Sequence, residues 1–155
     1  TNPVYLGLVR HKREMLPGEH EAIIDRETWD AVFETLLEGN RGWAQHVPVL
    51  ALGLVERHFE HNGKPNRHAA HDLGAASASL SYEAAARGLA VHQMGGFSGE
   101  RARELFDLPE GIEPYTALAI GYPAPPGTAD AQWHERDRKE RKRKSLDEIV
   151  IRGGL

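Results

Sequence analysis

The sequence of 155 residues contains no cysteine. This absence excludes disulfide bonds, thiolate catalysis and zinc sites with cysteine ligands. The chain has no run of about 18 apolar residues, so no membrane span is predicted. It also lacks a basic opening segment followed by an apolar one, so no secretion signal is predicted. We therefore expect a cytoplasmic protein. Because the first residue is Thr1, the chain can be a piece of a longer product.

An excess of positive charge is also absent, since the formal net charge is −4. This value argues against broad binding to nucleic acid, although a local basic patch can still contact phosphates. The chain is 40% hydrophobic and 27% charged, which is typical of an ordinary globular domain. Its length is enough to bury a sizeable core if its parts pack together.

The first 38 residues predict a short strand and one helix. The strand is expected over residues 4–10 and the helix over residues 26–37, with Asp25 as its N-cap and Gly39 as its end. The helix carries an apolar stripe with helical spacing, made of Trp29, Val32, Phe33, Leu36 and Leu37. One strand and one such stripe cannot form a core by themselves. We therefore expect these residues to be a separate stub.

Residues 39–155 mix predicted helices and strands without a regular βαβ repeat, which favours an α+β fold. The expected strands cover residues 47–55, 115–122 and 149–151. The expected helices cover residues 68–87, ended by Gly88, residues 99–106, capped by Ser98, and residues 130–139. The first of these helices is rich in alanine and serine, so another element can pack closely on it. The run from Pro123 to Gly127 is expected to break the chain.

A glycine pair follows the alanine-rich helix, within the segment Gln93, Met94, Gly95 and Gly96. Glycine has no side chain, so the backbone at such a pair can approach a flat ligand closely. The alternative is a loop that needs a positive φ angle, which glycine adopts without strain.

A basic cluster covers residues 141–144, with arginines at Arg141 and Arg143. Two guanidinium groups can bind a phosphate dianion through paired hydrogen bonds. The alternative is a solvated helix face, which is the more common origin of a charge run. His58 with His61, and His68 with His71, have a spacing that zinc ligands can show, but no metalloprotease motif accompanies them. We expect no metal, and we expect His71 and Asp72 to be hydrogen-bonded structural residues.

The glycine pair, the basic cluster and the segments 39–44 and 68–74 together resemble the C-terminal half of the nitroreductase family. The resemblance implies an FMN-dependent oxidoreductase in which NAD(P)H is the electron donor and a nitroaromatic or quinone-type compound the acceptor. It implies that Gln93 to Gly96 contact the flavin ring, and that Arg141 and Arg143 contact its phosphate. It also implies a homodimer with the alanine-rich helix near the subunit interface. No acid, base or nucleophile of the protein is implied, because the flavin carries the reaction.

The arginine-rich N-terminal motif of that family does not occur upstream of Gly39. We therefore expect a truncated or rearranged oxidoreductase that lacks the N-terminal half of the fold. In its place, Asn2 to Gly7, Gly18 to Asp25 and Trp29 resemble part of the DNA-binding recombinase domain of large serine recombinases. That resemblance leaves two alternatives, a DNA-contacting fragment that uses Arg10, Lys12 and Arg13, or an inactive fusion product. The expected domains are thus 1–38 and 39–155.

Overall fold

The computed structural model describes residues 8–11, 14–17, 24–125, 127–128 and 131–150. The strands are β1 (Leu8–His11), β2 (Glu14–Pro17), β3 (Val49–Glu56), β4 (Ala90–Met94) and β5 (Ile112–Gly121). The helices are α1 (Arg26–Thr35), α2 (Glu38–Ala44), α3 (Ala69–Ala86), α4 (Gly99–Leu105), α5 (Ala131–Arg138) and α6 (Leu146–Ile149). The chain divides into two compact units, residues 1–123 and residues 124–155. No described helix is both long enough and apolar enough to pass through a bilayer.

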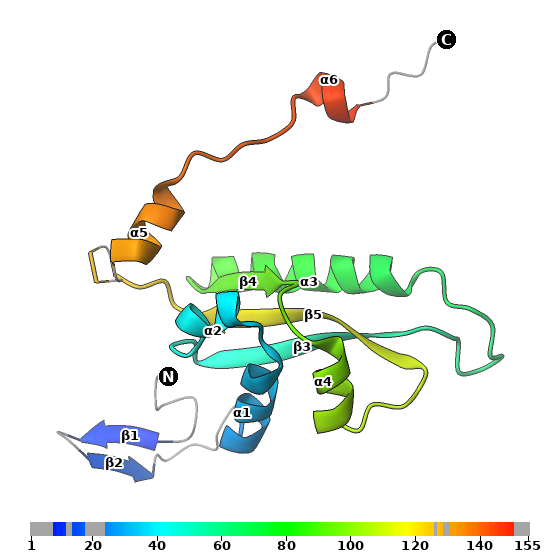
Figure 1. Ribbon diagram of the computed structural model, residues 1–155, viewed down its shortest axis with the longest axis horizontal. Coiled ribbons are helices and arrows are strands. Elements are labelled where there is room, and N and C mark those ends of the chain that lie inside the picture. Colours follow the sequence, from blue (N-terminus) through cyan, green and yellow to red (C-terminus); the bar gives the residue numbers. More distant parts are fainter. Residues whose placement is uncertain (1–7, 12–13, 18–23, 126, 129–130, 151–155) are drawn as a thin grey trace. The chain divides into compact units, whose positions relative to one another are not determined.

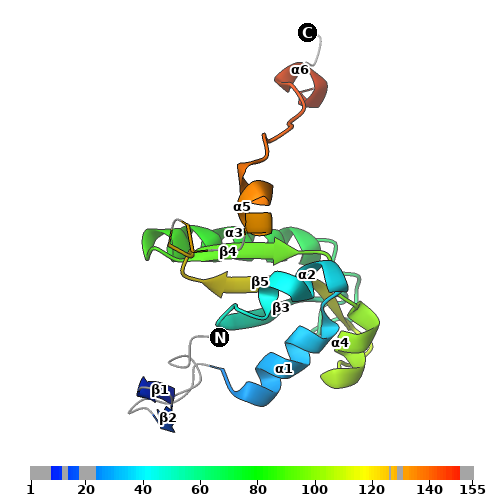
Figure 2. The same ribbon diagram turned by 60° about the vertical axis from the view of Figure 1, so that its left-hand side comes forward.

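The first unit is built on a three-stranded antiparallel sheet with the strand order β3-β5-β4. Figures 1 and 2 show α1 and α2 on one face of the sheet and α3 on the other. The central strand β5 therefore has a covering layer on each side. The pairing of β3 with β5 shifts register between Gly53 and Leu54, where a Cβ on Gly53 would lie 2.7 Å from Thr116 Cγ2. Gly53 thus allows the strands and α3 to approach closely.

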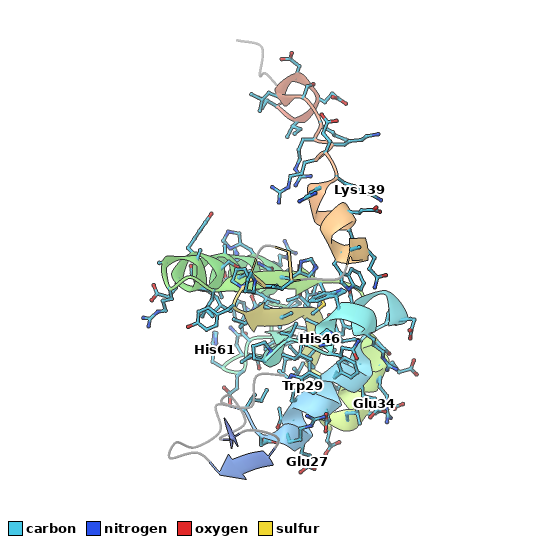
Figure 3. All side chains as sticks on the ribbon, turned by 90° about the vertical axis from the view of Figure 1, so that its left-hand side faces the viewer. Glu27, Trp29, Glu34, His46, His61 and Lys139 are labelled. Carbon is cyan, nitrogen blue, oxygen red and sulfur yellow. The ribbon has the colours of Figure 1, made fainter. Side chains whose placement is uncertain are left out.

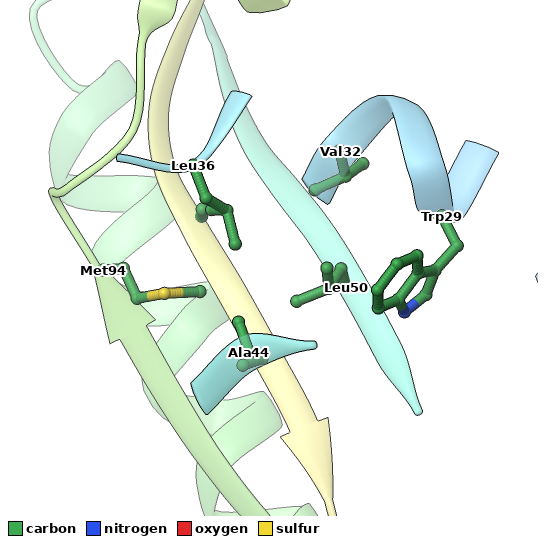
Figure 4. Packing of buried hydrophobic residues seen from close by; sticks show 8 residues of the cluster. Trp29, Val32, Leu36, Ala44, Leu50 and Met94 are labelled. Atoms are coloured by element: carbon green, nitrogen blue, oxygen red, sulfur yellow. The ribbon is translucent and has the colours of Figure 1, made fainter. Parts of the chain in front are cut away.

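One core lies between α1, α2 and the sheet (Figure 4). Trp29 and Val32 of α1 pack toward Leu50 of β3, while Met94 of β4 and Ala44 of α2 close the far side. Leu50 is 1% exposed and Trp29 is 4% exposed. The Trp29 ring also donates a hydrogen bond from Nε1 to the Val47 carbonyl at 3.1 Å, which satisfies its polar atom inside the core.

This packing joins the helix of residues 26–35 to the rest of the fold. Of the apolar stripe expected for an isolated stub, Trp29, Val32 and Leu36 are buried against the sheet with Phe33 packed beside them, whereas Leu37 is 54% exposed. The division into compact units falls at residue 123, beside the expected break at Pro123, and not at residue 38. Upstream, β1 pairs with β2 as an antiparallel hairpin. The strand β2 lies in a segment for which we expected no strand, while residues 4–7 of the expected strand lie outside the described part of the chain.

The end of the first helix differs from the expectation. The first helix ends at Thr35, and Gly39 lies inside α2 and does not end α1. The reason lies in tertiary contacts at this junction. Arg41 of α2 donates to the Leu36 carbonyl at 2.7 Å and to the Glu34 carbonyl at 2.6 Å. These bonds satisfy carbonyl groups that the end of α1 leaves without partners.

The alanine-rich helix α3 agrees with its prediction and ends in a Schellman motif. The Gly88 N–H donates to the Ala85 carbonyl at 3.0 Å, and the Leu89 N–H donates to the Ala84 carbonyl at 2.8 Å. Gly88 has a φ angle of 74°, which explains the glycine at this position. In the second unit, the expected strand 149–151 is wrong for Ile149, which belongs to helix α6.

The N-cap of α1 leads to a prediction on stability. Asp25 accepts hydrogen bonds from the Thr28 N–H at 2.7 Å and the Thr28 hydroxyl at 2.8 Å. The backbone bond first, and then the hydroxyl bond, lower the pKa of Asp25 below its ordinary value. We expect Asp25→Ala to lower the thermal unfolding midpoint at neutral pH, because α1 loses its cap.

The pH dependence of that loss follows from the lowered pKa. A carboxyl group with a lowered folded pKa stabilises the protein above its unfolded pKa, and this contribution disappears as the pH falls through the folded pKa. The difference in midpoint between the wild type and Asp25→Ala should therefore shrink as the pH falls well below the ordinary pKa of aspartate. Glu110→Ala, in the exposed turn before β5, is the matched control and should show little difference at either pH. A difference for Asp25→Ala that stays constant with pH would contradict this account.

Candidate flavin site at the glycine turn

The glycine pair lies directly after β4, which is an edge strand of the sheet. Three successive carbonyl groups of this turn have hydrogen-bond donors. The Thr116 hydroxyl lies 3.2 Å from the Met94 carbonyl oxygen, and the Phe97 N–H donates to the Gly95 carbonyl at 3.0 Å. The Gly96 carbonyl accepts the Leu37 N–H at 3.0 Å and the side-chain amide of Asn40, also at 3.0 Å. The turn is therefore attached to β5 and to α2.

The N–H groups of Gly95 and Gly96 have no hydrogen-bond acceptor in the part of the chain that the structure describes. The peptide bonds of the described residues are all trans, so each of these N–H groups points away from the carbonyl of the preceding residue. The Met94 and Gly95 carbonyl groups point toward their own donors, so the N–H groups of Gly95 and Gly96 point the other way. Both N–H groups are therefore available to a ligand. Gly95 is exposed, and a Cβ built on it would meet none of the described residues within 4 Å apart from its chain neighbours. Backbone donors beside open space suit a flat ligand with acceptor atoms on its edge.

The backbone angles exclude the alternative that we considered for this pair. The described glycines with a positive φ are Gly63, Gly88 and Gly127, so neither Gly95 nor Gly96 belongs to them. The absence of a side chain at Gly96 has another cause, because a Cβ there would lie 2.5 Å from the Asn40 amide nitrogen. At Gly95 no contact within the described protein requires glycine.

The two residues before the glycines differ in their surroundings. Gln93 is exposed, and its amide nitrogen lies 3.5 Å from the Ser81 hydroxyl of α3. Met94 is buried, and its side chain belongs to the core (Figure 4). A ligand at this turn can therefore meet the side chain of Gln93, but only the backbone of Met94.

The predicted phosphate ligands lie in the second unit. Arg141 and Arg143 are exposed residues between α5 and α6, and the guanidinium group of Arg143 donates to the Lys142 carbonyl at 3.3 Å. The helix α5 carries further basic residues, Arg136 and Arg138, in its last turn. These arginines belong to a different compact unit from the glycine turn, and their approach to it stays a prediction.

The histidine pairs that we weighed as zinc ligands are not part of this site. His71 Nδ1 lies 3.2 Å from the Asp72 carboxylate, which agrees with the hydrogen bond expected for these neighbours. His61 Nε2 lies 2.7 Å from the side-chain amide of Asn62. Among the described residues, no group of three or more side chains is arranged to hold a metal ion.

Charged residues anchor the helix that follows the glycine turn. Arg101 of α4 donates to Glu34 of α1 at 2.6 Å and to Glu104 of its own helix at 2.6 Å. The hydrogen bonds that Arg101 donates to Glu104 first, and then to Glu34, raise the pKa of Arg101 above its ordinary value. Figure 3 shows Glu34 at the junction of α1 and α4. The ion pair between Arg101 and Glu34 thus links α4 to α1. Such exposed pairs stabilise a fold only weakly.

Sequence reasoning missed the residues that hold the turn in place. Asn40, Leu37 and Thr116 all contact it through hydrogen bonds, and none was predicted as a site residue. Asn40 lies inside a segment that we quoted for its resemblance, which was the only signal available. The bond from Asn40 spans 56 positions of the chain, so no local pattern reveals it.

A small antiparallel sheet between helices, with a glycine turn at its edge, places the chain in the α+β class. Comparison with known proteins identifies the family within this class. The profile of the Nitroreductase family matches residues 5–122. The crystal structure of an oxidoreductase containing FMN is similar with a TM-score of 0.74 and 32% identity, over 84% of this chain and 67% of that chain. The chain therefore belongs to the nitroreductase family, and its fold is the α+β fold of that family.

Two further relatives extend the comparison. An uncharacterized 15.4 kDa protein of Mycolicibacterium smegmatis is 41% identical over 136 residues, which are 88% of this chain and 90% of the relative. A nitroreductase family protein from Clostridium difficile 630 has a TM-score of 0.59 at 21% identity, over 84% of this chain and 70% of that chain. The second likeness concerns the fold alone.

The family match also bears on the origin that we expected for the N-terminal segment. It begins at residue 5 and so includes nearly all of the segment that we compared with a recombinase domain. Together with the packing of α1 on the sheet, it gives no support to the recombinase resemblance. The coverage of the M. smegmatis relative likewise gives no support to a truncated or rearranged chain.

Proposed function

We propose that this chain is an FMN-dependent oxidoreductase that uses NAD(P)H to reduce a nitroaromatic or quinone-type acceptor. The glycine turn is the observation that carries the proposal. Its two N–H groups have no acceptor among the described residues, and it faces open space at Gly95. FMN, when bound, would supply the hydride-accepting ring. The membership in the nitroreductase family and the FMN of a solved relative support the choice of this cofactor.

The residues of this chain would bind and orient the cofactor. The backbone N–H groups of Gly95 and Gly96 would donate to acceptor atoms at the ring edge, and Gln93 would contact the ring beside them. Such donors favour electron density on the ring and so adjust its reduction. Arg141 and Arg143 would hold the phosphate, for which paired guanidinium groups are well suited. We assign no side chain of the protein as acid, base or nucleophile.

We further propose that the active form is a cytoplasmic homodimer that pairs through α3. The exposed face of this helix carries small residues together with Leu80, which is 42% exposed, and Tyr82, which is 77% exposed. Small side chains allow another helix to approach closely, and large exposed apolar groups are common at interfaces. The cysteine-free composition fits a reducing compartment. No observation favours DNA binding as a second function.

Reconstitution with FMN tests the proposal. At an FMN concentration about 100 times the dissociation constant, binding should add about 2.7 kcal/mol to the free energy of unfolding. We expect purified protein to take up FMN, to unfold at a higher temperature with it, and to oxidise NAD(P)H in its presence when an acceptor is added. Light scattering with and without FMN gives the oligomeric state. A midpoint that does not move in excess FMN would refute the proposal.

A further inference from the structure

Asn40 of α2 forms a long-range contact with the glycine turn. Its side-chain amide donates to the Gly96 carbonyl at 3.0 Å, and this bond is partly buried. The Leu37 N–H donates to the same carbonyl at 3.0 Å. A carbonyl oxygen has two lone pairs, so these two donors occupy both of them. The orientation of the Gly96 carbonyl is thereby set from the α2 side.

The helix that carries Asn40 is itself held against the sheet. The Trp43 ring of α2 meets His92 of β4 edge-on, with 5.1 Å between the ring centroids. The Arg41 guanidinium binds the carbonyl groups at the end of α1. The main-chain amide of Ser98, just past the turn, donates to the Thr35 carbonyl at 2.7 Å. These contacts hold the helix that carries Asn40 in place, and they also hold the residue that follows the turn.

The close approach of Asn40 also explains the glycine at position 96. A Cβ there would lie 2.5 Å from the Asn40 amide nitrogen, closer than real contacts allow. The amide is the end of a movable side chain, so an alanine at this position would displace it and break the bond. Asn40 and Gly96 thus form a matched pair, in which the small residue admits the donor.

We propose that Asn40 is a positioning residue for the flavin, acting through the Gly96 carbonyl. The bond fixes the peptide that follows Gly96, and through the turn it fixes the direction of the N–H groups of Gly95 and Gly96. Preorganised donors bind better because binding then costs less conformational entropy. This inference rests on the proposed function, since it assigns Asn40 to the same site.

A double-mutant cycle on the full chain tests the proposal. Asn40→Ala should raise the dissociation constant of FMN about tenfold and shift the midpoint potential of the bound flavin. In the Gly96→Ala background, where the amide is already displaced, Asn40→Ala should have no further effect on FMN affinity. Gln45→Ala is the matched control, because the Gln45 amide also donates to a backbone carbonyl of α2, that of Gly42 at 2.8 Å, without touching the turn.

Amide resonances of the flavin-free protein provide a readout that does not depend on binding. Asn40→Ala should shift those of Gly95, Gly96 and Phe97, and Gln45→Ala should leave them in place. If the wild type binds FMN and Asn40→Ala binds it equally well, the positioning role is overturned. It is also overturned if the effects of Asn40→Ala and Gly96→Ala on the dissociation constant multiply in the double variant. If the wild type binds no FMN, the proposed function fails, and the amide shifts alone then show whether Asn40 holds the turn. Unchanged shifts would overturn that as well.

Discussion

Gly95→Val should strongly weaken FMN binding while leaving the flavin-free fold intact. A Cβ at this position meets no other described residue within 4 Å beyond its chain neighbours, and the residue does not adopt a positive φ, so we expect the flavin-free protein to accept a side chain there. The same side chain would occupy the space next to the backbone donors. A ring held there must move away and lose both hydrogen bonds and contact area. We expect the dissociation constant to rise by roughly two orders of magnitude or more, since each lost hydrogen bond contributes about 0.5–1.5 kcal/mol.

The measurement is an FMN titration, combined with the thermal midpoint of the flavin-free protein. Gly111→Ala is the matched control, because a Cβ on Gly111, just before β5, also meets none of the described residues within 4 Å apart from its chain neighbours. That variant should bind FMN like the wild type. A Gly95→Val protein that keeps its affinity would place the flavin elsewhere. A Gly95→Val protein that unfolds would show that the space beside the turn is needed by the fold.

Local signals predicted much of this fold. Asp25 and Ser98 are caps with a side-chain acceptor for a main-chain N–H, and both helix starts occur where the sequence predicts them. Gly88 ends α3 because of its left-handed backbone. Each of these features depends on a few neighbouring residues. Such features can be predicted without knowing what the chain packs against.

The errors arise where distant residues decide the structure. The apolar stripe of α1 has no partner nearby in the sequence, so the helix was assigned to a separate stub. Its partners are Leu50, Met94 and the alanines of β5, which only the folded sheet brings together. Gly39 lies inside a helix although glycine costs about 1 kcal/mol there, and the contacts of Arg41 and Asn40 hold that helix in place.

The candidate site shows the same division. Two adjacent glycines are easily noticed in the sequence. The structure shows what each of them does. Gly95 leaves space toward solvent, whereas Gly96 makes room for Asn40. These two roles cannot be separated from the letters alone, because both produce a glycine. The second role depends on a contact across 56 positions.

Replacing both Arg141 and Arg143 with alanine should weaken FMN binding roughly 10²- to 10⁴-fold, because each charged hydrogen bond contributes about 1.5–3 kcal/mol. In this proposal the two arginines contact only the phosphate of FMN. Riboflavin lacks that group, so its affinity for the double variant should equal its affinity for the wild type. The affinity of the wild type for FMN should also fall with rising salt concentration, and that of the double variant should depend on salt much less.

The two basic residues in the last turn of α5, Arg136 and Arg138, provide the matched control. Replacing both with alanine removes the same charge from the same unit without touching the predicted phosphate ligands. The control should lose little FMN affinity. An equal loss in both double variants would mean that general positive charge attracts the cofactor. An FMN affinity that is unchanged without Arg141 and Arg143 would remove the second unit from the site and leave the glycine turn as its only predicted part.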